Sequence, residues 1–156
     1  MVVFAGKSDS VFRLKDALGE HNIHLTVATY PYGRKFRKSH SEEDAFIVPE
    51  ITSRESKIEI LSAGIDYIQG GLPFEPILSC TGDVATEMII SAYGTISKGL
   101  PHCISGAVMA FENGIVDEGE KIISASGDTA IVVTPTIRRE IFCGDFRIHK
   151  ILCKPE

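Results

Sequence analysis

The first group of residues that could bind a ligand follows the apolar run at the N-terminus. It consists of Gly6, Lys7, Ser8, Asp9 and Ser10. A glycine permits a sharp turn, and the unpaired N–H groups at a helix start, with hydroxyl and ammonium groups beside them, attract phosphate. The stretch matches neither a Walker nor a dinucleotide-binding motif. It predicts a phosphate-binding turn, with an ordinary helix N-cap as the alternative.

A second group follows the next β-branched run, residues 23–29. Tyr30 and Tyr32 precede the segment Arg34–Lys38, in which four of five residues are Lys or Arg. Guanidinium and ammonium groups bind phosphate, and aromatic side chains stack on flat rings. This pattern predicts that Arg34, together with Lys7, neutralises a phosphate and that Tyr30 or Tyr32 stacks on a ring. The alternative is an exposed, solvated loop.

A third group lies between two strand-like runs near the C-terminus. It consists of Ser126, Gly127, Asp128 and Thr129. Small residues allow a ligand to approach the backbone, and these side chains could bind hydroxyl groups or orient a phosphate. The alternative is a polar turn, because Ser, Gly and Asp are common in turns for conformational reasons.

Nucleophilic catalysis and metal binding find little support in the sequence. The five histidines are scattered, none belongs to a Gly-x-Ser-x-Gly motif, and the four cysteines form no Cys-x-x-Cys pair. Cys80 precedes a predicted helix start, where the pKa of a thiol is lowered, but no partner base is evident. We therefore expect no metal and buried, reduced thiols. Enzyme activity stays an open alternative, with Cys80 or a histidine near the cleft as the reacting group.

Length, composition and charge exclude several classes of protein. The chain has 156 residues, of which 44% are hydrophobic and 24% charged, and this indicates one domain over residues 1–156. Its net charge of −5 argues against a protein that coats nucleic acid. Residues 1–40 nevertheless hold seven of the 16 basic residues and three of the 21 acidic ones, so an anionic ligand should meet this part. Without a membrane-length apolar run or a secretion signal, a cytoplasmic protein is expected.

Strand-like and helical patterns alternate along the chain and must position these three groups. Strands are predicted at 2–5, 23–29, 65–69, 121–126, 130–134 and 147–153. Helical patterns follow Ser8, Pro49 and Asp83, and residues 103–113 fit a packed helix slightly better than a buried strand. The alternation predicts an α/β fold with an open, mostly parallel, three-layer sheet and helices on both faces. Because ligands bind at the carboxyl ends of such strands, the three groups should line one cleft.

At these residues the chain resembles a known family. The first ten residues resemble the strand, polar loop and helix with which the C-terminal α/β domain of pyruvate kinase holds the phosphate of its sugar-phosphate effector. Over nearly its full length the chain resembles the stand-alone, mostly archaeal proteins classed as pyruvate kinase C-terminal-domain-like. The residues that carry this resemblance are Met109-Ala110, Gly114-Ile115, Gly127–Val133, Pro135, Phe146, Ile148 and Ile151–Pro155.

The resemblance implies an open α/β sheet without the barrel domain in which kinase chemistry occurs, so pyruvate kinase activity is not expected. It implies a site for a phosphorylated small molecule at the strand ends, on Gly6–Ser10 and Ser126–Thr129, with flavin mononucleotide (FMN) a candidate in the stand-alone branch. The family normally places an extra helix, and in that branch a further strand, before the strand that here begins at Val2. Their absence predicts either that the start of the chain is incomplete or that a partner covers the exposed face.

The leading hypothesis is a domain that binds a phosphorylated small molecule, with FMN as the candidate cofactor, rather than nucleic acid or a membrane. One alternative is a flavin-dependent or phospho-metabolite enzyme. The other is a regulatory or structural subunit, in a homo-oligomer or with another chain.

Overall fold

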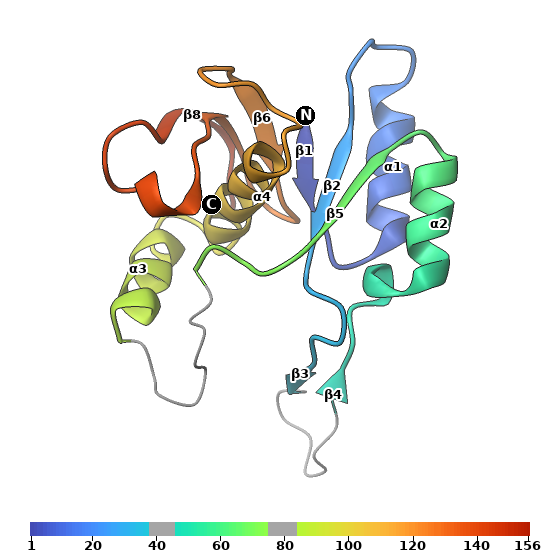
Figure 1. Ribbon diagram of the computed structural model, residues 1–156, viewed down its shortest axis with the longest axis horizontal. Helices are drawn as coiled ribbons and strands as arrows, with labels where there is room; N and C mark the ends of the chain where they lie inside the picture. Colours follow the sequence, from blue (N-terminus) through green and yellow to red (C-terminus); the bar gives the residue numbers. More distant parts are fainter. Residues whose placement is uncertain (38–45, 75–83) are drawn as a thin grey trace.

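The protein is built on a six-stranded sheet with the order β5-β2-β1-β6-β7-β8 (Figure 1). The computed structural model describes residues 1–37, 46–74 and 84–156. The strands are β1 (Val2–Phe4), β2 (Thr26–Thr29), β5 (Asp66–Gln69), β6 (Ile122–Ala125), β7 (Ala130–Thr134) and β8 (Arg147–Cys153). The first four strands of the sheet order pair in parallel. The strand β7 pairs antiparallel with both of its neighbours, β6 and β8. The predicted α/β fold with a mostly parallel sheet is confirmed.

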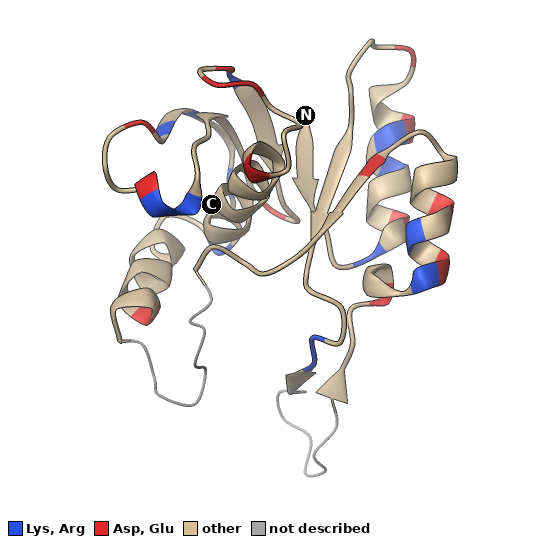
Figure 2. Cartoon of the chain, viewed as in Figure 1, with Lys and Arg blue, Asp and Glu red and all other residues tan. Residues whose placement is uncertain are grey.

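Helices pack against both faces of the sheet. The helices α1 (Ser8–Leu18) and α2 (Arg54–Ser62) lie on one face, and α3 (Val84–Gly94) and α4 (Leu100–Glu112) lie on the other (Figure 1). The helices α1 and α2 carry both signs of charge, whereas α3 shows a single acidic residue (Figure 2). Within the described ranges, no helix is long and apolar enough to cross a membrane.

The helix α4 is the most deeply buried helix of the described chain and forms from the segment that fitted either a strand or a helix. Ten of its residues are buried, from Leu100 to Ala110. Proline is tolerated in a first helical turn, and Pro101 lies there. A Cβ atom on Gly106 would lie 3.5 Å from Val2 and 3.6 Å from Phe4, so the helix backbone runs close to β1. Apolar side chains around most of this helix therefore reflect its burial rather than a strand.

The chain between β2 and α2 departs from the sequence prediction. The sequence pattern predicts neither a strand nor a helix between residues 30 and 48, but the structure has two short antiparallel strands there, β3 (Phe36–Arg37) and β4 (Phe46–Ile47). Residues 38–45, including Lys38, lie outside the described residues. The short 3₁₀ helix η1 (Glu50–Thr52) follows, and Ser53 then caps α2 by accepting a hydrogen bond from the Ser56 N–H.

The substitution Ile104→Ala tests how far the fold depends on α4. Ile104 is completely buried in the core between α4 and the sheet, so we expect a loss of about 2–5 kcal/mol in the free energy of unfolding. The control is Ile123→Ala in β6, where the side chain is 38% exposed and a much smaller loss is expected. Urea denaturation measures both, and equal losses would contradict a central role for α4.

Candidate functional site

The loops that follow three parallel strands meet at one edge of the sheet. Gly6 and Lys7 follow β1, Tyr30 follows β2, and Ser126 follows β6. Since β1 lies between β2 and β6 and all three run in parallel, their carboxyl ends share one edge. The structure thus brings the described residues of the three predicted groups to the same edge of the sheet, whereas the depression that Ser126, Gly127 and Asp128 line has no lining residue from the first two groups.

A cluster of aromatic rings and a histidine occupies the centre of this edge. The ring of Tyr30 meets those of Phe4 and Phe36 edge-on, with centroids 4.9 Å apart in each pair. The Tyr30 hydroxyl shares a hydrogen bond of 3.1 Å with Nε2 of His102, whose ring stacks on Phe4. The guanidinium of Arg34 lies 5.2 Å from the centre of the Phe36 ring. Tyr30 and Arg34 therefore belong to one packed cluster.

His102 lies in the first turn of α4 and is the central residue that sequence reasoning did not assign. Burial lowers its pKa, and the nearby Asp128 carboxylate opposes this shift. The imidazole is therefore mainly neutral at pH 7. Its partner Tyr30 is 72 residues away in the chain, so no local spacing could have identified the pair.

An open depression of ≈ 350 Å³ lies beside His102, between the start of α4 and the loop after β6. Its lining residues are Lys98, Gly99, His102, Ser126, Gly127 and Asp128. Ser126 donates a hydrogen bond of 3.1 Å to the Gly99 carbonyl, and Thr129 donates one of 2.8 Å to Asp128. Lys98 supplies a positive charge, and Asp128 a carboxylate that accepts hydrogen bonds. This combination can bind a ligand with both an anionic group and hydroxyl groups.

The N-terminus of α1 is occupied by a carboxylate of the same chain. The Ser8 N–H donates a hydrogen bond of 3.0 Å to Oε2 of Glu50, and the Ser8 hydroxyl donates to Oε1. The Ser56 hydroxyl also donates to Oε1, at 2.9 Å. Hydrogen bonds from Ser8 are the main reason that the pKa of Glu50 is lowered, and Lys7 adds a smaller attraction. Glu50 thus stabilises the helix start as an internal anion.

The other residues of the predicted phosphate turn have separate roles in the structure. Asp9 pairs with Arg13 at 2.6 Å, and both side chains are exposed. The Ser10 hydroxyl donates to the Lys7 carbonyl at 2.7 Å. Lys7 is exposed, while Gly6 lies against Tyr30, whose Cε2 would be 3.9 Å from a Cβ atom on that glycine. Ser8 and Ser10 are therefore hydrogen-bonded within the protein, and Lys7 faces solvent.

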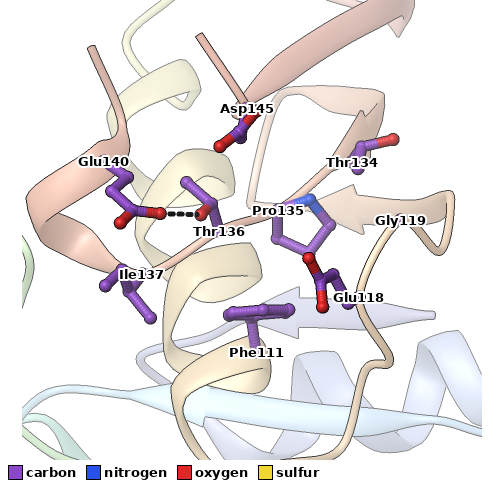
Figure 3. Close-up of a pocket in the computed structure, with 9 residues that line it drawn as sticks. All are labelled: Phe111, Glu118, Gly119, Thr134, Pro135, Thr136, Ile137, Glu140 and Asp145. Atoms are coloured by element: carbon purple, nitrogen blue, oxygen red, sulfur yellow. Dashed lines mark hydrogen bonds between the residues drawn. The ribbon is translucent and has the colours of Figure 1, made fainter. Parts of the chain in front are cut away.

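A second depression, of ≈ 460 Å³, lies at the opposite edge of the sheet. Thr134, which ends β7, lies at this edge because β7 runs antiparallel to β6. Figure 3 shows that Phe111 and Pro135 line it together with the carboxylates of Glu118, Glu140 and Asp145. Three carboxylates disfavour an anionic ligand. The edge at His102 is therefore the better candidate for such a ligand.

The cysteines differ from the predicted set of buried thiols. Cys103 is buried, and burial raises its pKa to about 11. Cys143 and Cys153 are exposed, so the prediction was wrong for these two. Cys80, the proposed reactive thiol, lies outside the described residues. Among the described residues, no group of three or more His, Cys, Asp or Glu side chains could hold a metal ion.

A comparison with models of known protein families gives no match to this chain. The chemistry of the site therefore has to be argued from its geometry. That geometry offers a mainly neutral histidine, His102, hydrogen-bonded to a tyrosine. It also offers a depression lined by both a lysine and an aspartate, and the exposed Lys7 on the loop after β1.

Replacing Glu50 by Gln tests its role as an internal anion. We expect the variant to lose about 1 kcal/mol of unfolding free energy at pH 7, because the capping carboxylate loses its charge at an exposed position. The folded-state pKa of Glu50 lies below its ordinary value of 4.5, so its contribution is present above that pH and disappears as the pH falls through the folded-state pKa. The difference from wild type should therefore be largest at pH 7 and become smaller as the pH is lowered below 4.5, which denaturation over a series of pH values measures. Glu59→Gln, on the exposed side of α2, is the control, and a pH-independent difference would contradict the assignment.

Gly99→Ala tests the contact between the start of α4 and the loop after β6. A Cβ atom at Gly99 would overlap the side-chain oxygens of Asp128 and Ser126 and lie 2.8 Å from Oγ1 of Thr129. These oxygens would have to move and lose hydrogen bonds, which we expect to cost about 1–3 kcal/mol of unfolding free energy. Gly127→Ala in the same loop meets no atom within 4 Å and should be nearly neutral. Thermal denaturation compares the two, and a neutral Gly99→Ala would contradict the contact.

Proposed function

We propose that the protein is a binding domain for a phosphorylated small molecule that carries hydroxyl groups. The observation that carries this proposal is the depression beside His102, where Lys98, Gly127 and Asp128 face one open space at the carboxyl ends of the strands. Lys98 and the N–H groups of the loop would hold the phosphate. Asp128 would accept hydrogen bonds from the hydroxyl groups of the ligand.

The Glu50 carboxylate at the start of α1 argues against placing the phosphate on the predicted turn Gly6–Ser10. Glu50 already accepts hydrogen bonds from the Ser8 N–H and hydroxyl, and a phosphate there would meet a negative charge. Lys98 lines the depression beside His102 together with Asp128, the one carboxylate among the lining residues that the structure describes, and Asp128 accepts a hydrogen bond from the Thr129 hydroxyl. We therefore assign the phosphate to the α4 side of the edge and leave Lys7 as a second cation on the central loop.

The resemblance to the pyruvate kinase C-terminal-domain-like family supports the same proposal, because it implies a phosphate site at these strand ends. FMN is the candidate ligand that this resemblance suggests. Ribose 5-phosphate offers the same combination of phosphate and hydroxyl groups without a ring and is therefore a suitable second probe.

Lys98→Glu tests the proposal. With FMN and ribose 5-phosphate as probes, we expect dissociation constants at least about tenfold higher in the variant, because a charge-assisted contact is replaced by repulsion. Lys121→Glu makes the same charge change ahead of β6, at the opposite edge, and should bind like wild type. Isothermal titration calorimetry measures the constants, and mass spectrometry identifies small molecules released from purified protein. Absence of binding and of any released phosphorylated compound, or equal effects of the two variants, would contradict the proposal.

A further inference from the structure

A third depression, of ≈ 400 Å³, lies on the α1–α2 side of the same edge. Its lining includes the side chains of Tyr32, Val48 and Pro49, and the polar residues Glu50 and Ser53 also line it. Its volume falls in the range of small-molecule sites, roughly 300–1,000 Å³. We propose that this depression, the Tyr32 pocket, binds a planar aromatic ring. The inference rests on the proposed function, because the ring would belong to the same ligand as the phosphate.

The exposure of the two tyrosines decides which one can stack on a ring. Tyr30 is packed against Phe4 and Phe36 and hydrogen-bonded to His102, so its ring is already used in contacts within the protein. Tyr32 is 81% exposed, although large aromatic side chains usually bury most of their surface. Val48, which also lines the pocket, is 51% exposed. Covering both side chains with a flat apolar ring would remove this surface from water.

The backbone holds Tyr32 in a fixed position. The Arg34 N–H donates a hydrogen bond of 3.1 Å to the Pro31 carbonyl, which closes a four-residue turn. Gly33, the third residue of that turn, has φ +80, as a type II turn requires. Tyr32 therefore sits at the second position of a tight turn. The turn restricts the backbone that carries this side chain, which lowers the backbone part of the entropic cost of binding a ligand there.

The charge at one side of the Tyr32 pocket specifies the kind of ring. The Glu50 carboxylate lines the pocket and is held in place by Ser8 and Ser56. A carboxylate accepts hydrogen bonds, so it favours a ring with N–H or amino donors and disfavours phosphate. Nitrogen heterocycles such as a purine or an isoalloxazine have this chemistry. The phosphate of the same ligand would then lie away from Glu50.

The spacing of the strands allows one ligand to reach both sites. The Tyr32 turn follows β2, and the loop at Asp128 follows β6, with β1 between them. Neighbouring strands lie about 4.8 Å apart, so the two loops begin about 10 Å from each other. The exposed Lys7, on the β1 loop between them, supplies a positive charge along this path. A nucleotide is longer than this separation of the loop starts, so we assign the ring of one ligand to Tyr32 and its phosphate to Lys98.

The test compares ring-bearing and ring-free probes in variants of Tyr32. Riboflavin and adenosine carry a ring without phosphate, FMN and adenosine monophosphate carry both, and ribose 5-phosphate carries no ring. We expect Tyr32→Ala to weaken binding of the ring-bearing probe that binds wild type by about tenfold or more and to leave ribose 5-phosphate unchanged. Tyr32→Phe keeps the stacking surface and should retain the wild-type affinity. Equilibrium dialysis with absorbance detection measures the ring-bearing probes, and calorimetry measures ribose 5-phosphate.

Phe142→Ala is the matched control, because it removes another exposed aromatic side chain, 62% exposed, away from the pocket. Val48→Asp changes another residue that lines the pocket and should also weaken the binding of the ring-bearing probes. Binding of ribose 5-phosphate without binding of any ring-bearing probe overturns the ring site and leaves the proposed function standing. Equal effects of Tyr32→Ala and Phe142→Ala, or equal losses in Tyr32→Ala and Tyr32→Phe, also overturn it. Ring binding that depends on Tyr32 with no effect of Lys98→Glu contradicts the phosphate assignment alone.

Discussion

The packing of α4 against β1 and β6 is the constraint on which both the core and the candidate site depend. Gly106 lets the helix backbone approach Val2 and Phe4, and Ser124 of β6 donates a hydrogen bond of 2.7 Å to the Cys103 carbonyl. The same helix begins after Gly99 and carries His102 in its first turn. A shift of α4 would therefore move one wall of the depression beside Asp128. Core packing and site geometry are coupled through a single helix.

An internal carboxylate divides the carboxyl edge of the sheet into two electrostatic regions. On the α1 side, Glu50 satisfies the Ser8 N–H and hydroxyl and offsets the positive end of the helix dipole. On the α4 side, Lys98 lies at the rim of an open depression. Glu50 therefore favours hydrogen-bond donors on the α1 side, whereas the α4 side offers both a cation, Lys98, and a carboxylate, Asp128. Such a division suits a ligand with chemically different ends.

The sequence predicted the alternating elements and the edge at which the polar groups meet, because both follow from local periodicity and from the parallel sheet. It predicted Ser126, Gly127 and Asp128 in the depression, but not their neighbours Lys98, Gly99 and His102 or the position of Glu50 at Ser8. Ser126 reaches Gly99 across 27 residues of chain, and Glu50 reaches Ser8 across 42, distances at which no spacing rule applies. The helical pattern after Asp83 predicted a helix, and α3 forms there, with Ile89 and Tyr93 partly buried against the core and none of its residues fully buried. The strands β3 and β4 pair only two residues each, too few to leave a pattern.

His102 bears on whether the edge binds a ligand or also catalyses a reaction. A general base needs a nitrogen within reach of the substrate, but Nε2 of His102 is shared with the Tyr30 hydroxyl, and the ring is fixed on Phe4. The neighbouring thiol of Cys103 donates to the Thr129 carbonyl at 3.3 Å, and its pKa of about 11 keeps it protonated at pH 7. Nε2 of His102 and the thiol of Cys103 are therefore both hydrogen-bonded within the protein. These hydrogen bonds connect Tyr30 to α4 and α4 to the loop after β6, so they help to hold the edge of the sheet in one arrangement.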